Sequence, residues 1–169
     1  FESIGCCKKH RCDSIFWIGQ SNIKNKFKQL VQERNIDNFS FSLEDLFPSD
    51  KCIGVSNMTT SLILLFYALK VDKLDLRDVA YLFSRHSPRY KTTLNKLYQI
   101  AHIMSAIDII RKTKQIGEVI LCTYYFDYDS VPEYEQKKID YRSIESFLNT
   151  NENKSNELIQ RRRREFNCF

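Results

Sequence analysis

Amide and cationic side chains recur at helical spacing in one segment of the chain. Apolar residues three and four positions apart predict an amphipathic helix from about Tyr90 to Met104 or beyond, with an apolar side formed by Leu94, Leu97, Tyr98, Ala101, Met104 and Ile107. The polar positions between them are Lys91, Asn95, Lys96, Gln99 and His102. Amide and ammonium groups donate hydrogen bonds to the base edges and phosphates of DNA. We expect base contacts from Asn95, Lys96 and Gln99; the alternative is a solvated helix face.

Two short strands are expected directly after this helix, at 107–112 and 118–123, with a turn at 114–117. Two more helices are expected before it: one beginning at Met58 or Thr59 with caps at 59–61 and continuing through Leu69, and one at 77–83. Three helices and a two-stranded wing are typical of a winged helix-turn-helix domain. The fold class expected is therefore mainly α with small β-hairpins (α+β). Such a domain places its third helix in the major groove and its hairpin on the DNA backbone.

Charge is segregated along the 169 residues, although the net charge is only +5. Between Ser84 and Glu118 there are seven basic residues against two acidic ones. A basic segment within an otherwise balanced protein suits a polyanion, with a solvated face as the alternative. The basic side chains expected on phosphates are Arg89, Lys91, Arg111, Lys112 and Lys114.

Composition limits the other function classes. The 43% of apolar residues suffices for a packed core, and no apolar run is long enough to span a membrane. No glycine-rich phosphate loop, nucleophile elbow or pair of catalytic carboxylates stands out, so we expect no enzyme activity, cofactor or small-molecule substrate. The chain opens FESIGCC, without an initiator methionine, and we expect an internal fragment.

The remaining segments are expected to support this module. Strands are predicted at 4–9 and 14–18 with a turn at 10–13, followed by a helix at 22–34. A semi-ordered connector with docking aromatics is expected at 37–55. Beyond Asp127 the pattern weakens into a polar, partly disordered tail with one short helix at 141–148.

The segment TTLNKLYQIAHIMSAIDII, residues 92–110, resembles the recognition helix and following strand of the E2F/DP family of transcription factors. The match is carried by Tyr98, Ile100, Ala101 and the run Ile107–Ile110. The opening FESIGCCKKHRCDSIFWIG is similar to the helix end and wing of the same family, through Glu2, Ile4, Gly5, Lys9, Ser14, Ile15, Trp17 and Gly19. Two such modules resemble the atypical branch of the family, whose tandem domains act without a DP partner.

The resemblance implies a domain order and a function. Residues 1–19 would be the wing of a first winged helix, 20–57 a connector, 58–126 a second winged helix and 127–169 a tail. It implies a nuclear, sequence-specific regulator of cell-cycle genes transcribed by RNA polymerase II. The partners would be double-stranded DNA and a homo- or heterodimer with another protein of this type. The implied DNA contacts add Tyr98, Lys8, Lys9 and Arg11 to the residues above.

The chain departs from the family where bases are read. Asn95 and Lys96 replace the paired arginines that read guanine, and Gln99 replaces the following aspartate. Asparagine favours adenine, and lysine still reaches guanine or phosphate. Two rivals follow: a winged-helix protein-interaction or dimerisation module with degenerate DNA reading, and a nonspecific nucleic-acid-binding subunit.

Other motifs have two interpretations each. Cys6, Cys7, His10 and Cys12 form a tight cluster that suggests zinc, but the wing alignment explains them without metal and we expect no metal site. All six cysteines are expected as free thiols rather than a disulfide framework. Ser87–Pro88 is a turn or a phosphorylation site, His102 is expected at the surface, and Arg161–Arg164 is an import signal or a charged tail.

Overall fold

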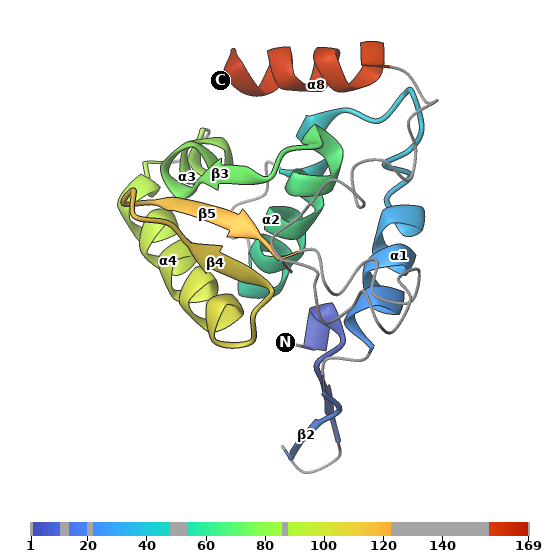
Figure 1. Ribbon diagram of the computed structural model, residues 1–169, viewed down its shortest axis with the longest axis vertical. Coiled ribbons are helices and arrows are strands. Elements are labelled where there is room, and N and C mark those ends of the chain that lie inside the picture. The colour runs from blue at the N-terminus through green and yellow to red at the C-terminus, as the bar shows by residue number, and fades with distance from the viewer. Residues whose placement is uncertain are drawn as a thin grey trace, which may run out of the picture.

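The computed structural model combines helices with two small antiparallel sheets, one of which is a hairpin that projects from the rest (Figure 1), and it describes residues 2–10, 14–19, 22–47, 54–85, 88–122 and 156–168. The described residues form five α-helices, so the expected α+β class is confirmed at this level. The elements are η1 (Glu2–Ile4), β1 (Cys7–Lys9), β2 (Ile15–Trp17), α1 (Ile23–Glu33), η2 (Leu43–Leu46), α2 (Val55–Leu69), β3 (Lys73–Asp75), α3 (Leu76–Ser84), α4 (Tyr90–Ala106), β4 (Ile110–Lys112), β5 (Glu118–Leu121) and α8 (Asn156–Asn167).

Helix α2 is the centre of the core. All residues from Met58 to Leu69 are buried, because a helix that is apolar on every side has no face to offer to water. The expected start at Met58 or Thr59 is wrong: the helix begins at Val55 with Gly54 as its N-cap. The hydroxyls expected to cap it bond elsewhere. Thr59 donates to the carbonyl of Val55 one turn back (2.8 Å), and Ser61 donates to the carbonyl of Leu46 in η2 (2.7 Å).

Helices α3 and α4 pack together beside a three-stranded sheet ordered β3-β5-β4. Lys112 pairs with Val119 and Ile110 with Leu121, which confirms the expected hairpin with shorter strands. Strand β3 was not expected, and it pairs with β5 through Leu74 and Val119. Lys73–Asp75 has only one buried residue, too short an alternation for the sequence to reveal a strand.

The amino-terminal hairpin and helix are close to expectation. β1 and β2 pair antiparallel, with Lys8 opposite Phe16, and α1 buries Ile23, Phe27 and Val31. The expected strand start at Ile4 is wrong, since Glu2–Ile4 is a 3-10 helix. Gly5 ends that turn at φ +80°, a conformation that favours glycine, and directs the chain into β1.

The connector docks on the core rather than standing apart. η2 begins with a capping box, in which Ser42 and Asp45 exchange side-chain and backbone hydrogen bonds. Phe47 contacts Phe83 of α3 edge to face, with ring centroids 4.8 Å apart. Residues from Ile4 to Leu121 therefore share one buried cluster, which includes segments expected to belong to separate modules. The division of the chain into those modules stays a prediction.

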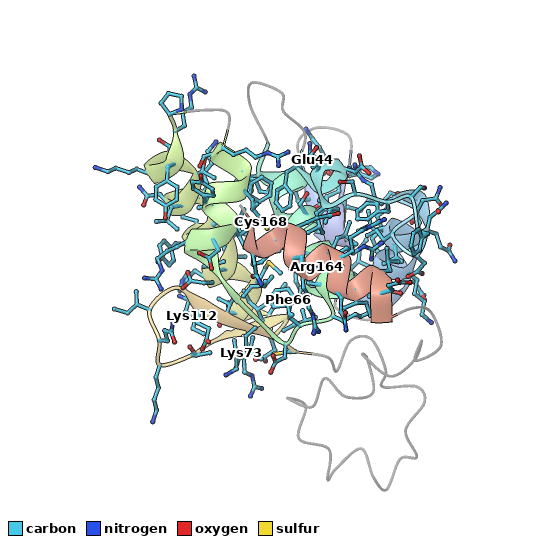
Figure 2. The ribbon with its side chains drawn as sticks, turned by 90° about the horizontal axis from the view of Figure 1, so that it is seen from above. Glu44, Phe66, Lys73, Lys112, Arg164 and Cys168 are labelled. Atoms are coloured by element: carbon cyan, nitrogen blue, oxygen red, sulfur yellow. The ribbon has the colours of Figure 1, made fainter. Side chains whose placement is uncertain are left out.

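Helix α8 was not anticipated, because Arg161–Arg164 gives it a strongly polar sequence. It lies across the molecule above Phe66 of α2, with Arg164 and Cys168 on its length (Figure 2). Arg162 is 3% exposed and donates to the carbonyls of Ile36 and Ala68. Arg163 donates to the carbonyls of Leu69 (2.9 Å) and Lys70 (2.6 Å). The carbonyls of Ala68, Leu69 and Lys70 are at the carboxyl end of α2, where a helix leaves its carbonyls without partners, so α8 caps α2.

Lys70, the left-handed residue that ends α2, predicts a pH dependence of stability. Burial lowers its pKa to about 8 from an ordinary 10.5, and its ammonium lies 3.5 Å from the centre of the Tyr67 ring. Between those two pH values the unfolded chain binds more protons than the folded one, so this residue's contribution to the free energy of unfolding rises with pH.

Lys70→Met is therefore expected to stabilise the protein relative to wild type more at pH 7 than at pH 10. Urea denaturation at pH 7, 8.5 and 10 measures the difference between the two proteins. The exposed neighbour Lys73, changed to methionine, is the matched control and should give a difference that does not vary with pH. If the stability difference between Lys70→Met and wild type also stayed constant with pH, the lowered pKa of Lys70 would be refuted.

Candidate nucleic-acid interface

The outer face of α4 is a continuous exposed stripe. At about 100° per residue, its seven exposed positions fall within about a third of the helix circumference: Lys91, Thr92, Asn95, Gln99, His102, Ile103 and Ala106. Asn95 and Gln99 lie at the centre of this stripe. The opposite side is the apolar face that the sequence predicts, where Leu97, Ala101 and Met104 are buried. The buried face fixes the rotation of the helix, and so fixes which side chains face outward.

Two predicted residues are at the margins of this stripe. Lys96 is half-buried at one margin, so it is not central to the face. Tyr98 is half-buried at the other and packs against the core. Its hydroxyl points to the wing turn, as a Cβ built on Gly117 would lie 3.4 Å from it. Tyr98 therefore positions the wing against α4 instead of lying on the exposed face.

Cations gather at the amino end of α4. Arg89 is the N-cap residue and Lys91 lies in the first turn, which has no acidic residue. The amino end of a helix carries partial positive charge, so each cation there destabilises the helix by about 0.3–1 kcal/mol. The same arrangement attracts an anion, because backbone N–H groups and side-chain charges point to one place. This end of α4 suits a phosphate.

The wing joins this face through its β4 strand. Lys112 Nζ lies 3.4 Å from His102 Nδ1 on α4, which places Lys112 beside the stripe. Lys114 and Ile116 are exposed at the turn, where Thr113 Oγ1 accepts a hydrogen bond from the Gln115 amide (3.1 Å). The structure thus places the predicted residues Lys91, Asn95 and Gln99 on one stripe, with Lys112 beside it at His102 and Lys114 exposed at the turn of the wing.

Arg111 is on the other face of the same sheet. Side chains alternate along a strand, so Arg111 points away from the side that carries Ile110 and Lys112. Its Nη2 atom lies 3.8 Å from Asp108 Oδ1. Across the sheet, Arg111 is opposite Ile120 of β5, and Ile120 is opposite Lys73 of β3. The two adjacent residues therefore lie on opposite faces of the sheet, and phosphate contact by each of them stays a prediction.

The turn of the wing is anchored where α3 begins. Asp75 caps α3 by accepting from the Arg77 amide (2.8 Å), and its carboxylate is paired with the Arg77 guanidinium. Hydrogen bonds from Arg77 lower the pKa of Asp75. The Leu76 amide donates to the carbonyl of Gly117 (2.9 Å). The wing is therefore held at both its strand pairing and its turn.

Gly117→Ala is expected to destabilise the protein by about 2–3 kcal/mol, because it combines backbone strain with a steric clash. Gly117 has φ +91°, and an added Cβ would lie 2.9 Å from Asp75 Oδ1 and 3.3 Å from Arg77 Nε. Gly19 is the matched control: it has φ +95° but nothing within 4 Å of an added Cβ. Gly19→Ala should cost about 1 kcal/mol or less. Urea denaturation measures the stability lost in each variant. Equal losses in the two variants would contradict an anchored wing turn.

The amino-terminal hairpin is not part of this face. Lys8 and Lys9 are exposed on β1, and Arg11 lies outside the described residues. Figure 1 shows the hairpin projecting away from the three-stranded sheet. Strand β2 and the residue after it expose a run of large apolar side chains: Ile15 (69%), Phe16 (58%), Trp17 (58%) and Ile18 (47%). The sequence alternation predicts these strands but gives no indication that both faces are open.

The cysteine cluster is divided by its surroundings. Cys6 is fully buried, which raises the pKa of its thiol, whereas Cys7 is partly exposed on β1. His10 packs edge to face on Phe16, with centroids 5.4 Å apart, and Cys12 lies outside the described residues, as does Ser87. Cys6, Cys7, Cys122 and Cys168 are free thiols.

Besides the small Ala106, two residues of the stripe were missed by sequence reasoning. Thr92 and Ile103 flank the central amides on the same side, and Ile103 is 42% exposed. Their signal was available, since both follow the polar arc of the helix, but an isoleucine there reads as part of the core.

None of the described helices has the length and apolar character needed to cross a membrane. No family model matches the chain, and no curated protein or solved structure matches it at a significant level.

Proposed function

We propose that this chain is a winged-helix DNA-binding module of a nuclear transcription regulator of the E2F/DP type. Helix α4 enters the major groove of double-stranded DNA, and the β4–β5 wing contacts phosphates. The observation that carries the proposal is that the exposed stripe on α4 meets the wing, where His102 of the stripe lies beside Lys112 of β4.

The order of the elements supports the winged-helix part of the proposal. α2, β3, α3, α4, β4 and β5 follow one another, and β5 lies between the other two strands. α4 follows α3 after a short connection, as the recognition helix follows its partner in a helix-turn-helix. The Ser84–Glu118 segment, with seven basic and two acidic residues, supplies the electrostatic part.

A salt titration of the intact chain tests this function. A fluorescent 16-base-pair duplex of mixed sequence should bind at 50 mM salt, and the logarithm of the binding constant should fall linearly with the logarithm of salt concentration. A slope of about −3 to −5 is expected, since each neutralised phosphate contributes about 0.9. Absence of binding at 50 mM salt would reject the proposal.

A protein-interaction or dimerisation module is the second candidate, and the exposed apolar run Ile15–Ile18 on one hairpin strand favours it. Contiguous exposed apolar side chains mark association surfaces. Sedimentation velocity from micromolar to near-millimolar chain concentration tests self-association. A dimer that Trp17→Ser returns to monomer, with no DNA binding at low salt, would support this candidate over the first.

A further inference from the structure

We propose that the exposed face of α4 reads A·T base pairs through Asn95 and Gln99, with Thr92 and Ile103 on thymine methyl groups. The inference rests on the proposed function, because it assigns the bases to a helix already placed in the major groove. It names a target class that the basic residues alone do not indicate, since phosphate contacts carry no sequence information.

The central positions of the stripe are both amides. Asn95 and Gln99 are four residues apart, hence one above the other on the same side of the helix. Both are exposed, and within the described part of the chain neither amide has a hydrogen-bond partner. An amide both donates and accepts, so it matches the N7 acceptor and N6 donor that adenine presents in the major groove. Guanine offers two acceptors there and leaves the amide oxygen without a partner.

The flanking positions match the other base of the pair. Thr92 and Ile103 lie along one side of the amides, each at a spacing of three or four residues from its nearer amide. Both carry exposed methyl groups, and Ile103 is 42% exposed although it is a large apolar residue. The C5 methyl of thymine is the apolar feature of the major groove. Amides on adenine and methyl groups on thymine therefore read the same pairs.

Residues suited to guanine are absent from the centre. None of the 17 residues of α4 is an arginine. Lys91 is in the first turn, where it faces a phosphate, and Lys96 is half-buried at the margin. His102 is held beside Lys112 at the wing. At this face, therefore, only Lys96 could contact guanine, and its side chain would have to extend past Ile103 to do so.

Selection from duplexes with a randomised ten-base-pair core tests the inference with the intact chain. Wild type should enrich cores with A·T at two or more adjacent positions. Gln99→Ala and Asn95→Ala should each lose enrichment at one of those positions. Gln32→Ala, an exposed glutamine on α1, is the matched control and should select the same core as wild type.

Modified bases separate base reading from DNA shape. In the selected duplex, 7-deaza-adenine is placed only at the position where Gln99→Ala loses enrichment. It removes only the N7 acceptor and should weaken wild type about tenfold, with little further loss in Gln99→Ala. Uracil replaces one thymine at a time and removes its methyl group; at one position it should weaken wild type about threefold, but not Ile103→Ser.

The outcomes distinguish this inference from the function beneath it. Binding with enrichment of G·C pairs, or with no enrichment, would overturn the A·T assignment alone. A·T enrichment that survives 7-deaza-adenine and both amide changes would also overturn it, because shape would then be the signal. No retention of any duplex at 50 mM salt would reject the DNA-binding function itself.

Discussion

Arg162→Met is expected to lower the free energy of unfolding by about 3 kcal/mol, the largest loss expected from any arginine in the part of the chain that the structure describes. Arg162 is 3% exposed, and its guanidinium donates to the carbonyls of Ile36, Asn38 and Ala68. It also lies 5.0 Å above the Phe41 ring. Methionine keeps most of the apolar stem but leaves the buried carbonyls of Ile36 and Ala68 with fewer donors, at a cost of about 1–3 kcal/mol for each one left without a donor.

Arg164→Met is the matched control, two residues along the same helix. Arg164 is exposed, and its guanidinium donates to the Gln160 carbonyl of its own helix (3.4 Å). Its replacement should change stability by less than about 0.5 kcal/mol. Equal effects in urea denaturation would mean that α8 is not docked. The pair also bears on Arg161–Arg164 as an import signal, because arginines that cap α2 are occupied while the protein is folded.

Lys112→Glu is expected to weaken DNA binding roughly tenfold or more at 50 mM salt and to reduce the salt slope by about one phosphate. The ammonium is beside His102 on the α4 side of the sheet, where the wing and the exposed stripe meet. A glutamate there removes a phosphate contact and adds repulsion. Fluorescence anisotropy with the duplex of the salt titration measures both quantities.

Lys73→Glu changes the net charge by the same amount in the same sheet. Lys73 lies on β3 opposite Ile120 of β5, which separates it from Arg111 of β4, on the face away from α4. Figure 2 shows that Lys73 and Lys112 are both at the sheet but on different strands. The control should weaken binding less than about threefold through long-range charge alone. Equal losses would contradict a wing oriented by its Lys112 face.

The elements that sequence revealed are those with a strong period. Leu97, Ala101 and Met104 recur at helical spacing and fix both the existence and the rotation of α4. From that rotation the outward direction of Asn95 and Gln99 follows without a structure. The β4–β5 hairpin was equally accessible, because polar turn residues separate two apolar runs.

The elements that sequence concealed depend on distant partners. Strand β3 exists because Leu74 pairs with Val119, 45 positions along the chain, and nothing local indicates it. The four arginines of α8 read as solvated, yet Arg162 is buried because the carboxyl end of α2 supplies carbonyls for its charge. Tertiary pairing decides both cases. The opposite faces of Arg111 and Lys112, by contrast, follow from the alternation of any strand and were open to prediction from the expected strand at 107–112.

Amide chemical shifts of the ¹⁵N-labelled intact chain, titrated with a mixed-sequence duplex at 50 mM salt, test most directly whether α4 and the wing are the DNA-binding surface. The largest changes are predicted for Lys91–Ile103 and for Lys112–Gly117, with β1, α1 and α8 nearly unaffected. Changes centred on the Cys7–Trp17 hairpin or on α8, with α4 unperturbed, would contradict it.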